Sequence, residues 1–255
     1  MSSPATSRDW DAASYHRVSD PHLEWAREQF ERLPLAGDEV LLDAGCGSGR
    51  VTAVLAERVP RGRVYAVDVA PSMAAHAREA LGERATVLCQ DLVELSLPEP
   101  VDAIFSNATF HWIPDHDALF AALYRALKPG GRLVAQCGGK GNIDRFRRLA
   151  DAVAGELPFA PFFAGWRGPW TYASATETTA RLERAGFEDV ECWLQPKDVT
   201  PADPYAFVET VCLLRHLDRL PDDLRAAFVG RVLEAAGEPF VLDYVRLNMT
   251  AKRPG

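Results

Sequence analysis

Four polar residues in the first half of the chain each follow a short apolar run: Asp43, Asp68, Asp91 and Asn107. The runs, such as "EVLLDAG" and "RVYAVDV", are typical of buried strands that end near these residues. The carboxyl ends of parallel strands meet at one edge of an open α/β sheet, where ligands bind. One aspartate at such a place is more often a turn or cap residue. Four at the same edge predict a ligand site.

The glycines that follow Asp43 narrow the class of ligand. Gly45, Gly47 and Gly49 stand at alternate positions, whereas a dinucleotide loop requires G-x-G-x-x-G. Asp43 would also place a negative charge beside a pyrophosphate, which is an unfavourable contact. S-adenosylmethionine carries a cationic sulfur and no phosphate, so the same carboxylate would favour it. Asp68 can accept two hydrogen bonds from a ribose diol, a requirement that nicotinamide cofactors share.

Regular alternation of strands and helices must position these residues. The pattern through about residue 137 predicts a parallel sheet with helices on both faces. We expect strands at 38–45, 62–69, 85–91, 101–107 and 128–138, with helices at 50–59, 71–81 and 115–127.

The pattern after residue 138 is less even. Residues 138–141 read as a junction, residues 157–170 as an aromatic loop or lid, and Ser174 as the cap of a helix. We therefore expect one integrated domain in three parts. They are an N-terminal arm with the cofactor-binding core (1–137), a lid or substrate segment with a helix (138–186), and the last two strands (187–255) with a helical insertion at 200–237.

Composition excludes several classes of protein. The formal net charge of the 255 residues is −8, and an acidic balance disfavours a broad surface for nucleic acid. The five cysteines show no CxxC pair, which argues against a zinc site or a disulfide framework. No apolar run reaches membrane-spanning length, and no basic-then-apolar signal opens the chain. We expect a cytoplasmic monomer or homodimer that acts on a small molecule, with no nucleic acid, membrane or metal partner.

Five segments in order, "LLDAGCGSG", "VYAVD", "CQDL", "VDAIFSNATFHW" and "ALKPGGRLV", resemble the motifs of class I S-adenosylmethionine-dependent methyltransferases. The resemblance covers about 40–134. It implies a Rossmann-like seven-stranded sheet with an antiparallel last strand and helices on both faces. Beyond this core, "GPWTYASATETTARLERAGFEDVE" and "YAFVETVCLLRHLDRLPDDLRAAFVGRVLE" resemble the trans-aconitate methyltransferase group, whose mark is a helical insertion before the last strand. His111 stands where that group places a glutamine.

The resemblance implies S-adenosylmethionine as cofactor and S-adenosylhomocysteine as product. It also implies methyl transfer to a small-molecule acceptor, most simply a carboxylate or hydroxyl, although nitrogen and carbon acceptors stay open. An NAD-dependent dehydrogenase and a non-catalytic cofactor-binding protein are the alternatives. We expect Tyr15 to contact the cofactor when the N-terminal segment closes over it. The full set of expected cofactor-binding residues is Tyr15, Asp43, Gly45, Gly47, Asp68, Val69, Met73, Asp91, Leu92 and Asn107.

Candidate acceptor-binding residues follow the fourth strand and fill the aromatic loop. His111 is the candidate general base, since histidine exchanges protons near neutral pH, although it can instead shape the pocket through a backbone hydrogen bond. Trp112 is a candidate pocket wall. In the loop, Trp166 and Trp170 can line an apolar pocket, and Arg167 can pair with a carboxylate.

Overall fold

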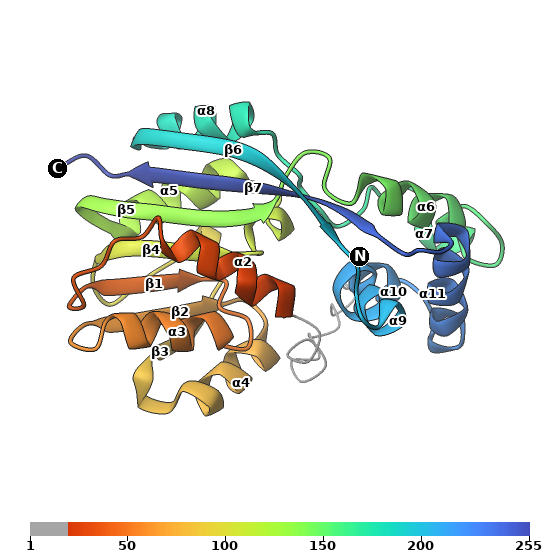
Figure 1. The fold of residues 1–255 in the computed structure, drawn as a ribbon, viewed down its shortest axis with the longest axis horizontal. Helices are drawn as coiled ribbons and strands as arrows, with labels where there is room; N and C mark the ends of the chain where they lie inside the picture. The colour runs from red at the N-terminus through yellow and green to blue at the C-terminus, as the bar shows by residue number, and fades with distance from the viewer. Residues whose placement is uncertain (1–19) are drawn as a thin grey trace, which may run out of the picture.

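The computed structural model describes residues 20–255, with side chains from residue 25 onward. Its centre is a seven-stranded sheet in the order β3-β2-β1-β4-β5-β7-β6 (Figure 1). β7 runs antiparallel to both of its neighbours, and the pairs among β1 to β5 are parallel. This confirms the predicted Rossmann-like fold. The strands are β1 (Val40–Ala44), β2 (Arg63–Asp68), β3 (Thr86–Cys89), β4 (Val101–Asn107), β5 (Leu127–Gly138), β6 (Glu188–Val199) and β7 (Leu242–Lys252).

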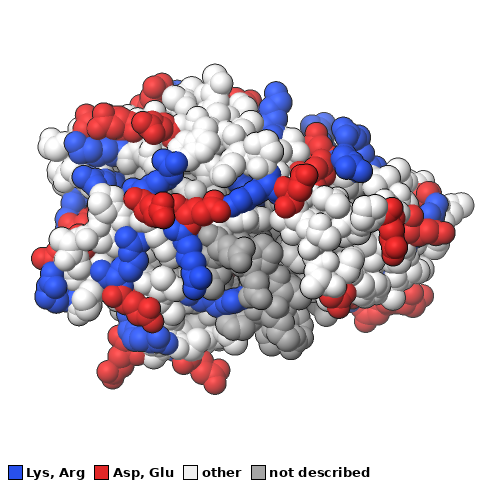
Figure 2. Space-filling model, in the orientation of Figure 1, with Lys and Arg blue, Asp and Glu red and all other residues white. Residues whose placement is uncertain are grey.

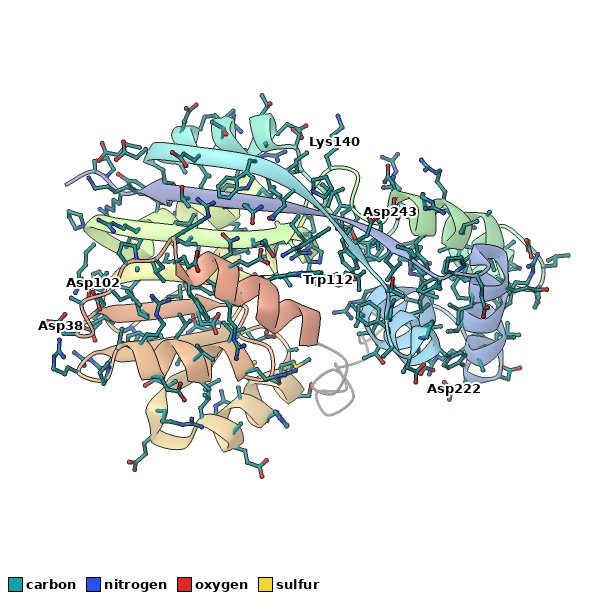
Figure 3. All side chains as sticks on the ribbon, viewed as in Figure 1. Asp38, Asp102, Trp112, Lys140, Asp222 and Asp243 are labelled. Carbon is teal, nitrogen blue, oxygen red and sulfur yellow. The ribbon has the colours of Figure 1, made fainter. Side chains whose placement is uncertain are left out.

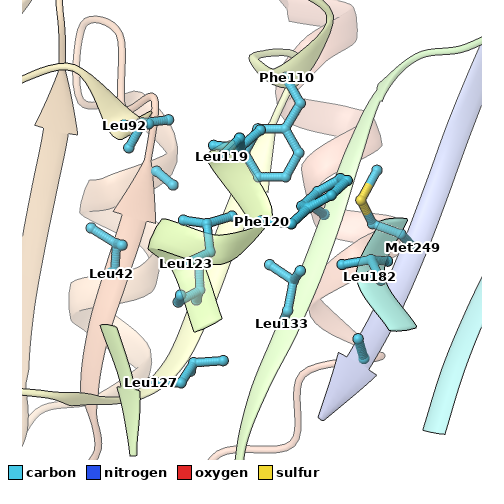
Figure 4. Close-up of a cluster of buried hydrophobic side chains, with 14 of the residues drawn as sticks. Leu42, Leu92, Phe110, Leu119, Phe120, Leu123, Leu127, Leu133, Leu182 and Met249 are labelled. Atoms are coloured by element: carbon cyan, nitrogen blue, oxygen red, sulfur yellow. The ribbon is translucent and has the colours of Figure 1, made fainter. Parts of the chain in front are cut away.

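Helices cover both faces of the sheet because successive strand residues point to opposite sides. Leu41 packs with the face that carries α2 (Asp20–Phe30) and α3 (Arg50–Arg58), and α4 (Pro71–Leu81) lies on the same side over β2 and β3. Leu42 packs with the opposite face, under α5 (His116–Ala126) and α8 (Ala175–Ala185). Figure 4 shows that side, where Leu119, Phe120 and Leu123 of α5 fill the space between Leu42 and Met249.

A second group of helices forms what we call the helical unit, at one end of the long strands β6 and β7 (Figure 1). It has its own hydrophobic core, separate from those of the sheet. Residues from 143–172 and from 207–244 share this core, although the sequence-based division placed them in different parts of the chain. The unit comprises α6 (Asp144–Ala154), α7 (Ala160–Phe163), α9 (Pro204–Phe207), the π-helical η4 (Val208–Cys212), α10 (Leu214–Leu217) and α11 (Asp222–Ala236).

Short turns of 3-10 helix lie between some of the strands and helices, and one of them makes β3 shorter than predicted. Asp91 caps η2 (Leu92–Glu94) by accepting a hydrogen bond from Val93 N–H, so β3 ends earlier than expected. The other two turns are η1 (Gly82–Arg84) and η3 (Phe110–Trp112). β6 continues to Val199 because it pairs with β7 along its length. On the face in Figure 2, Lys and Arg lie among Asp and Glu, with no broad basic area on its described part.

Candidate functional site

A cavity of about 400 Å³ opens at the carboxyl edge of the parallel strands; we call it the strand-edge cavity. Asp43, Asp68 and Asn107 end or nearly end β1, β2 and β4, and all three line it. Except for Tyr15, which lies outside the described residues, every predicted cofactor-binding residue lines this cavity. They are Asp43, Gly45, Gly47, Asp68, Val69, Met73, Asp91, Leu92 and Asn107.

The glycine loop beside this cavity uses its own amide groups. The N–H groups of Gly45 and Cys46 both donate to Val67 O, at 2.8 and 2.9 Å. Gly47 N–H donates to Asp68 Oδ2 at 2.9 Å, and Gly49 N–H donates to Cys46 O at 3.0 Å. A pyrophosphate needs such donors turned toward it. The amides of Gly45, Cys46, Gly47 and Gly49 are therefore used within the protein and are not turned toward a phosphate.

Glycine is required at position 45 for two reasons. Its φ of 87° lies in the left-handed region that side chains disfavour. A Cβ built there would stand 2.1 Å from Thr109 Oγ1, a distance no real contact reaches. The loop from β1 thus lies directly against the segment after β4, which brings two edges of the cavity together.

Asp43 is a buried carboxyl in the wall of the cavity, with 1% of its surface exposed. Thr52 Oγ1, from α3, donates a hydrogen bond to its Oδ2 at 2.6 Å. Burial raises the pKa of Asp43 to about 7, and the neighbouring charge of Asp68 pushes the pKa the same way, against the hydrogen bond from Thr52. A positively charged ligand would offset this cost of burial, whereas an anion would add to it.

Asp68, Asp91 and Asp115 also line this cavity, and backbone hydrogen bonds hold the first two in place. Asp68 accepts from Gly47 N–H through Oδ2 and from Ala70 N–H through Oδ1, both at 2.9 Å. Asp91 accepts from Val93 N–H at 3.0 Å. Each carboxylate oxygen can accept a second hydrogen bond, so hydroxyl and amino donors of an adenosine suit this set. The size of the cavity, the buried carboxyl of Asp43 and these hydrogen-bond acceptors together fit S-adenosylmethionine.

A second, smaller cavity of about 30 Å³, the inner cavity, adjoins the first. Ala108 and Trp112 line both. Trp112 lies between the strand ends and the helical unit (Figure 3). The remaining described residues of the inner cavity come from the sheet, the aromatic loop and the helical unit. They are His111, Asn142, Ile143, Trp170, Tyr172, Val211, Cys212, Tyr244 and Arg246.

His111 is buried in the wall of the inner cavity, with 7% of its surface exposed. Its Nδ1 accepts a hydrogen bond from the N–H of Gly138 at 3.2 Å. Because a backbone N–H can only donate, the neutral ring carries its proton on Nε2. A ring in this state donates from Nε2, which argues against the predicted role as a general base.

The aromatic loop divides in the structure. Trp170 stacks on Tyr172, with ring centroids 5.7 Å apart, and both line the inner cavity. Trp166 packs instead against His216 and Phe163 in the helical unit, and Arg167 is exposed. Neither of these two is among the described residues that line the two cavities. The structure therefore does not bring the predicted Arg167 clamp to the site.

Sequence reasoning missed the polar residues that the last strand supplies. Tyr244 and Arg246 are 5% and 1% exposed, on β7. A signal was present, since an arginine inside the apolar strand "YVRLNM" is unusual in a buried sheet. Arg215 of α10 was missed at the strand-edge cavity, where it shows that the helical unit reaches the first cavity.

The described residues hold no cluster of three or more His, Cys, Asp or Glu placed to bind a metal ion. Among the same residues, no helix combines the length and apolarity that a membrane crossing requires.

Comparisons with known proteins identify the family of this chain. Residues 42–135 match a family described as "Methyltransferase domain". Trans-aconitate 2-methyltransferase from Methylobacterium nodulans is 34% identical, over 96% of this chain and 98% of its own. The protein of that name from Azoarcus sp. is 40% identical over 87% of each chain. Haemonchus contortus phosphoethanolamine N-methyltransferase 2, solved with phosphomonomethylethanolamine and S-adenosylhomocysteine, has a TM-score of 0.61 at 20% identity, over 96% of this chain and 57% of that one.

The fold and the site define a class I S-adenosylmethionine-dependent methyltransferase. Within that class, the chain belongs to the trans-aconitate 2-methyltransferase family. This confirms the predicted enzyme class and cofactor, and it removes the dehydrogenase alternative.

Proposed function

We propose that the chain transfers a methyl group to a carboxylate of a small organic acid such as trans-aconitate, an acid with three carboxyl groups. One observation carries the proposal: the strand-edge cavity, which holds the aspartates, adjoins the smaller inner cavity, which has the buried Arg246 in its wall. The first suits a cationic nucleoside and the second suits an anion. The names of the relatives support a carboxylate acceptor.

The residues of the strand-edge cavity bind and orient the methyl donor in this proposal. Asp68 accepts the ribose hydroxyls, while Asp91 and Leu92 hold the adenine. Asp43, fixed by Thr52, places negative charge near the cationic end. Met73, Val69 and Asn107 complete the wall, and Gly45 and Gly47 let the backbone approach closely.

Transfer to a carboxylate requires no general base. When bound, S-adenosylmethionine supplies an electrophilic methyl group: a carboxylate oxygen forms the O–CH₃ bond while the C–S electron pair returns to sulfur. The acceptor has already lost its proton at neutral pH. The chain therefore contributes alignment and exclusion of water. Trp112, in the wall that both cavities share, is placed to separate the reacting groups from solvent.

Methyl transfer from labelled S-adenosylmethionine to trans-aconitate tests the proposal. We expect labelled product that releases methanol in mild alkali, because methyl esters hydrolyse under conditions that ethers and N- or C-methyl compounds survive. Label that survives alkali would indicate another acceptor atom. Absence of transfer to trans-aconitate and to a panel of di- and tricarboxylic acids would contradict a carboxylate acceptor.

A further inference from the structure

The inner cavity gathers its polar groups around one backbone position, Gly138. In the β5–β7 ladder Gly138 pairs with Arg246, and its N–H donates to His111 Nδ1 at 3.2 Å. A Cβ added there would meet Tyr172 Cε1 at 2.6 Å and Asn142 Nδ2 at 2.9 Å. Four polar side chains from distant parts of the sequence therefore converge on a single point, and the absence of a side chain on Gly138 makes room for them.

Arg246 is held in place by a buried network of amides. Its Nε donates to Gln136 Oε1 at 3.2 Å, and its guanidinium lies over the ring of Trp25, 4.6 Å from the centroid. Gln136 in turn donates to Asn248 Oδ1 at 2.6 Å, and Gln29 donates to the same oxygen at 2.9 Å. A guanidinium fixed in this way loses little conformational entropy when it binds a carboxylate.

The lining of the inner cavity has the polarity of an anion site. Arg246 brings a positive charge to the cavity, and the described residues that line the cavity include no Asp or Glu. Burial raises the pKa of Tyr172 and of Tyr244, so both phenols stay neutral and add no negative charge to the cavity. His111 adds an Nε2–H donor. A volume of about 30 Å³ has room for about two waters, which is the size of one carboxylate and too small for a whole metabolite.

We infer that the inner cavity holds one carboxylate of the acceptor, with Arg246 as its cationic partner and His111 Nε2–H as a second donor. This rests on the proposed function. A carboxylate whose charge is matched by a guanidinium is a weak nucleophile, so the oxygen that takes the methyl group belongs to another carboxyl group of the same acceptor. That group points toward the strand-edge cavity, beside Ala108 and Trp112, which line both cavities.

Steady-state kinetics with trans-aconitate as acceptor test the inference. We expect Arg246→Met to raise the acceptor KM by at least about 30-fold, since breaking a buried charge contact is costly, and Arg246→Lys to raise it about tenfold. His111→Phe keeps the ring but removes the donor, and it should raise KM about tenfold. His111→Gln keeps an N–H donor and should stay within about threefold of the unmodified enzyme.

Two controls make these results specific. Affinity for S-adenosylmethionine, measured by calorimetry, should change by less than about twofold in each variant, which also shows that the variant folds. Arg167→Met, in the exposed loop arginine, should leave the acceptor KM unchanged; if it raises KM while Arg246→Lys does not, the carboxylate lies at the aromatic loop and the inference is wrong.

Other outcomes also decide the question. Equal losses of kcat in His111→Phe and His111→Gln, without a change in KM, would indicate proton transfer and contradict the donor role. Normal KM in Arg246→Lys, Arg246→Met and His111→Phe, in an enzyme that methylates trans-aconitate, would overturn this inference and leave the proposed function standing. If the unmodified enzyme methylates no carboxylic acid, the proposed function fails and the inference falls with it.

Discussion

The two cavities at the strand ends differ in how the chain builds them. Among the described residues, the lining of the strand-edge cavity comes from one stretch, 43–115, with Arg215 added from the helical unit. The described lining of the inner cavity comes from five separate stretches, 108–112, 142–143, 170–172, 211–212 and 244–246. Their charges differ too: aspartates outnumber arginines among the described lining of the first, whereas the described lining of the second has the buried Arg246 and no Asp or Glu. The binding of a shared cofactor is thus encoded locally, whereas recognition of the acceptor depends on the tertiary fold.

The largest expected effect comes from Gly45, where the strand-edge cavity tolerates no side chain. In Gly45→Ala the new Cβ would clash with Thr109 and the backbone would be strained at positive φ. We expect affinity for S-adenosylmethionine to fall by about 100-fold, measured by calorimetry. Gly130→Ala is the control, because Gly130 also has a positive φ but open space around its Cβ. Similar losses of affinity in both variants would show that backbone strain at positive φ, rather than the clash with Thr109, weakens cofactor binding.

The charge of the strand-edge cavity predicts a pH dependence of cofactor binding. Asp43 has a pKa of about 7 in the folded chain, so it gains a proton as the pH falls through 7. A cationic ligand binds the ionised form better. Affinity for S-adenosylmethionine should therefore fall below pH 7, by up to about tenfold per pH unit, and level off above it. S-adenosylhomocysteine has a neutral sulfur and should show a shallower slope; equal slopes would mean that Asp43 does not sense the sulfonium.

Asp43→Asn separates binding from stability in the same cavity. The folded pKa of about 7 lies above the unfolded value near 3.8, so the ionised group costs stability fully above pH 7 and less as the pH falls toward 4. The variant should stabilise the ligand-free protein by about 1 to 3 kcal/mol at pH 8 and lose the pH slope of cofactor affinity. Chemical denaturation at pH 8 and pH 5 measures the gain, which should shrink at pH 5. A variant less stable at pH 8 would contradict the assigned burial cost.

The sequence predicted the strand-edge cavity because strand ends can be recognised locally. Apolar runs locate β1, β2 and β4, and the residues that end them share an edge by geometry. The inner cavity could not be predicted in this way. Arg246 lies on β7, which pairs with β5 and β6. Its partner residue on β5 is more than a hundred residues earlier in the chain, and its partner on β6 is about fifty residues earlier. Arg167 has the same chemistry in a local aromatic context, so the sequence favoured it, although the fold leaves it exposed.

His111 shows the same limit within a single residue. Its position after β4 was predicted, but its protonation depends on Gly138, which belongs to β5. The backbone hydrogen bond from Gly138, which occupies Nδ1 of the candidate base, is not revealed by the sequence alone.

Trp112 and Trp170 test whether the two cavities act separately. Trp112 lines both cavities, whereas Trp170 lines only the inner one among the described lining residues, and their ring centroids are 6.2 Å apart. We expect Trp112→Ala to raise both the cofactor Kd and the acceptor KM by about tenfold. Trp170→Ala should raise the acceptor KM by about fivefold and leave the cofactor Kd unchanged. A change of cofactor Kd in Trp170→Ala would show that the cavities are energetically coupled.

The smallest expected effect lies outside both cavities, at the cap of α8. Ser174 Oγ accepts from Glu177 N–H at 3.2 Å, and Glu177 Oε2 accepts from Ser174 N–H at 2.9 Å. Tyr172, two residues earlier, sits in a segment held by the hydrogen bond from Thr171 N–H to His111 O at 2.8 Å. Ser174→Ala should cost about 1 kcal/mol of stability, measured by denaturation.

Because this cap anchors the segment that carries Trp170 and Tyr172, Ser174→Ala should also raise the acceptor KM, by about two- to threefold. The cofactor Kd should not change, since the strand-edge cavity draws nothing from this segment. Ala227→Gly is the control, because Ala227 is exposed on α11 and is not among the described residues that line either cavity; this variant should lower stability by about 1 kcal/mol without raising the acceptor KM. A rise in KM in both variants would mean that global stability, rather than local anchoring of the aromatic segment, controls the inner cavity.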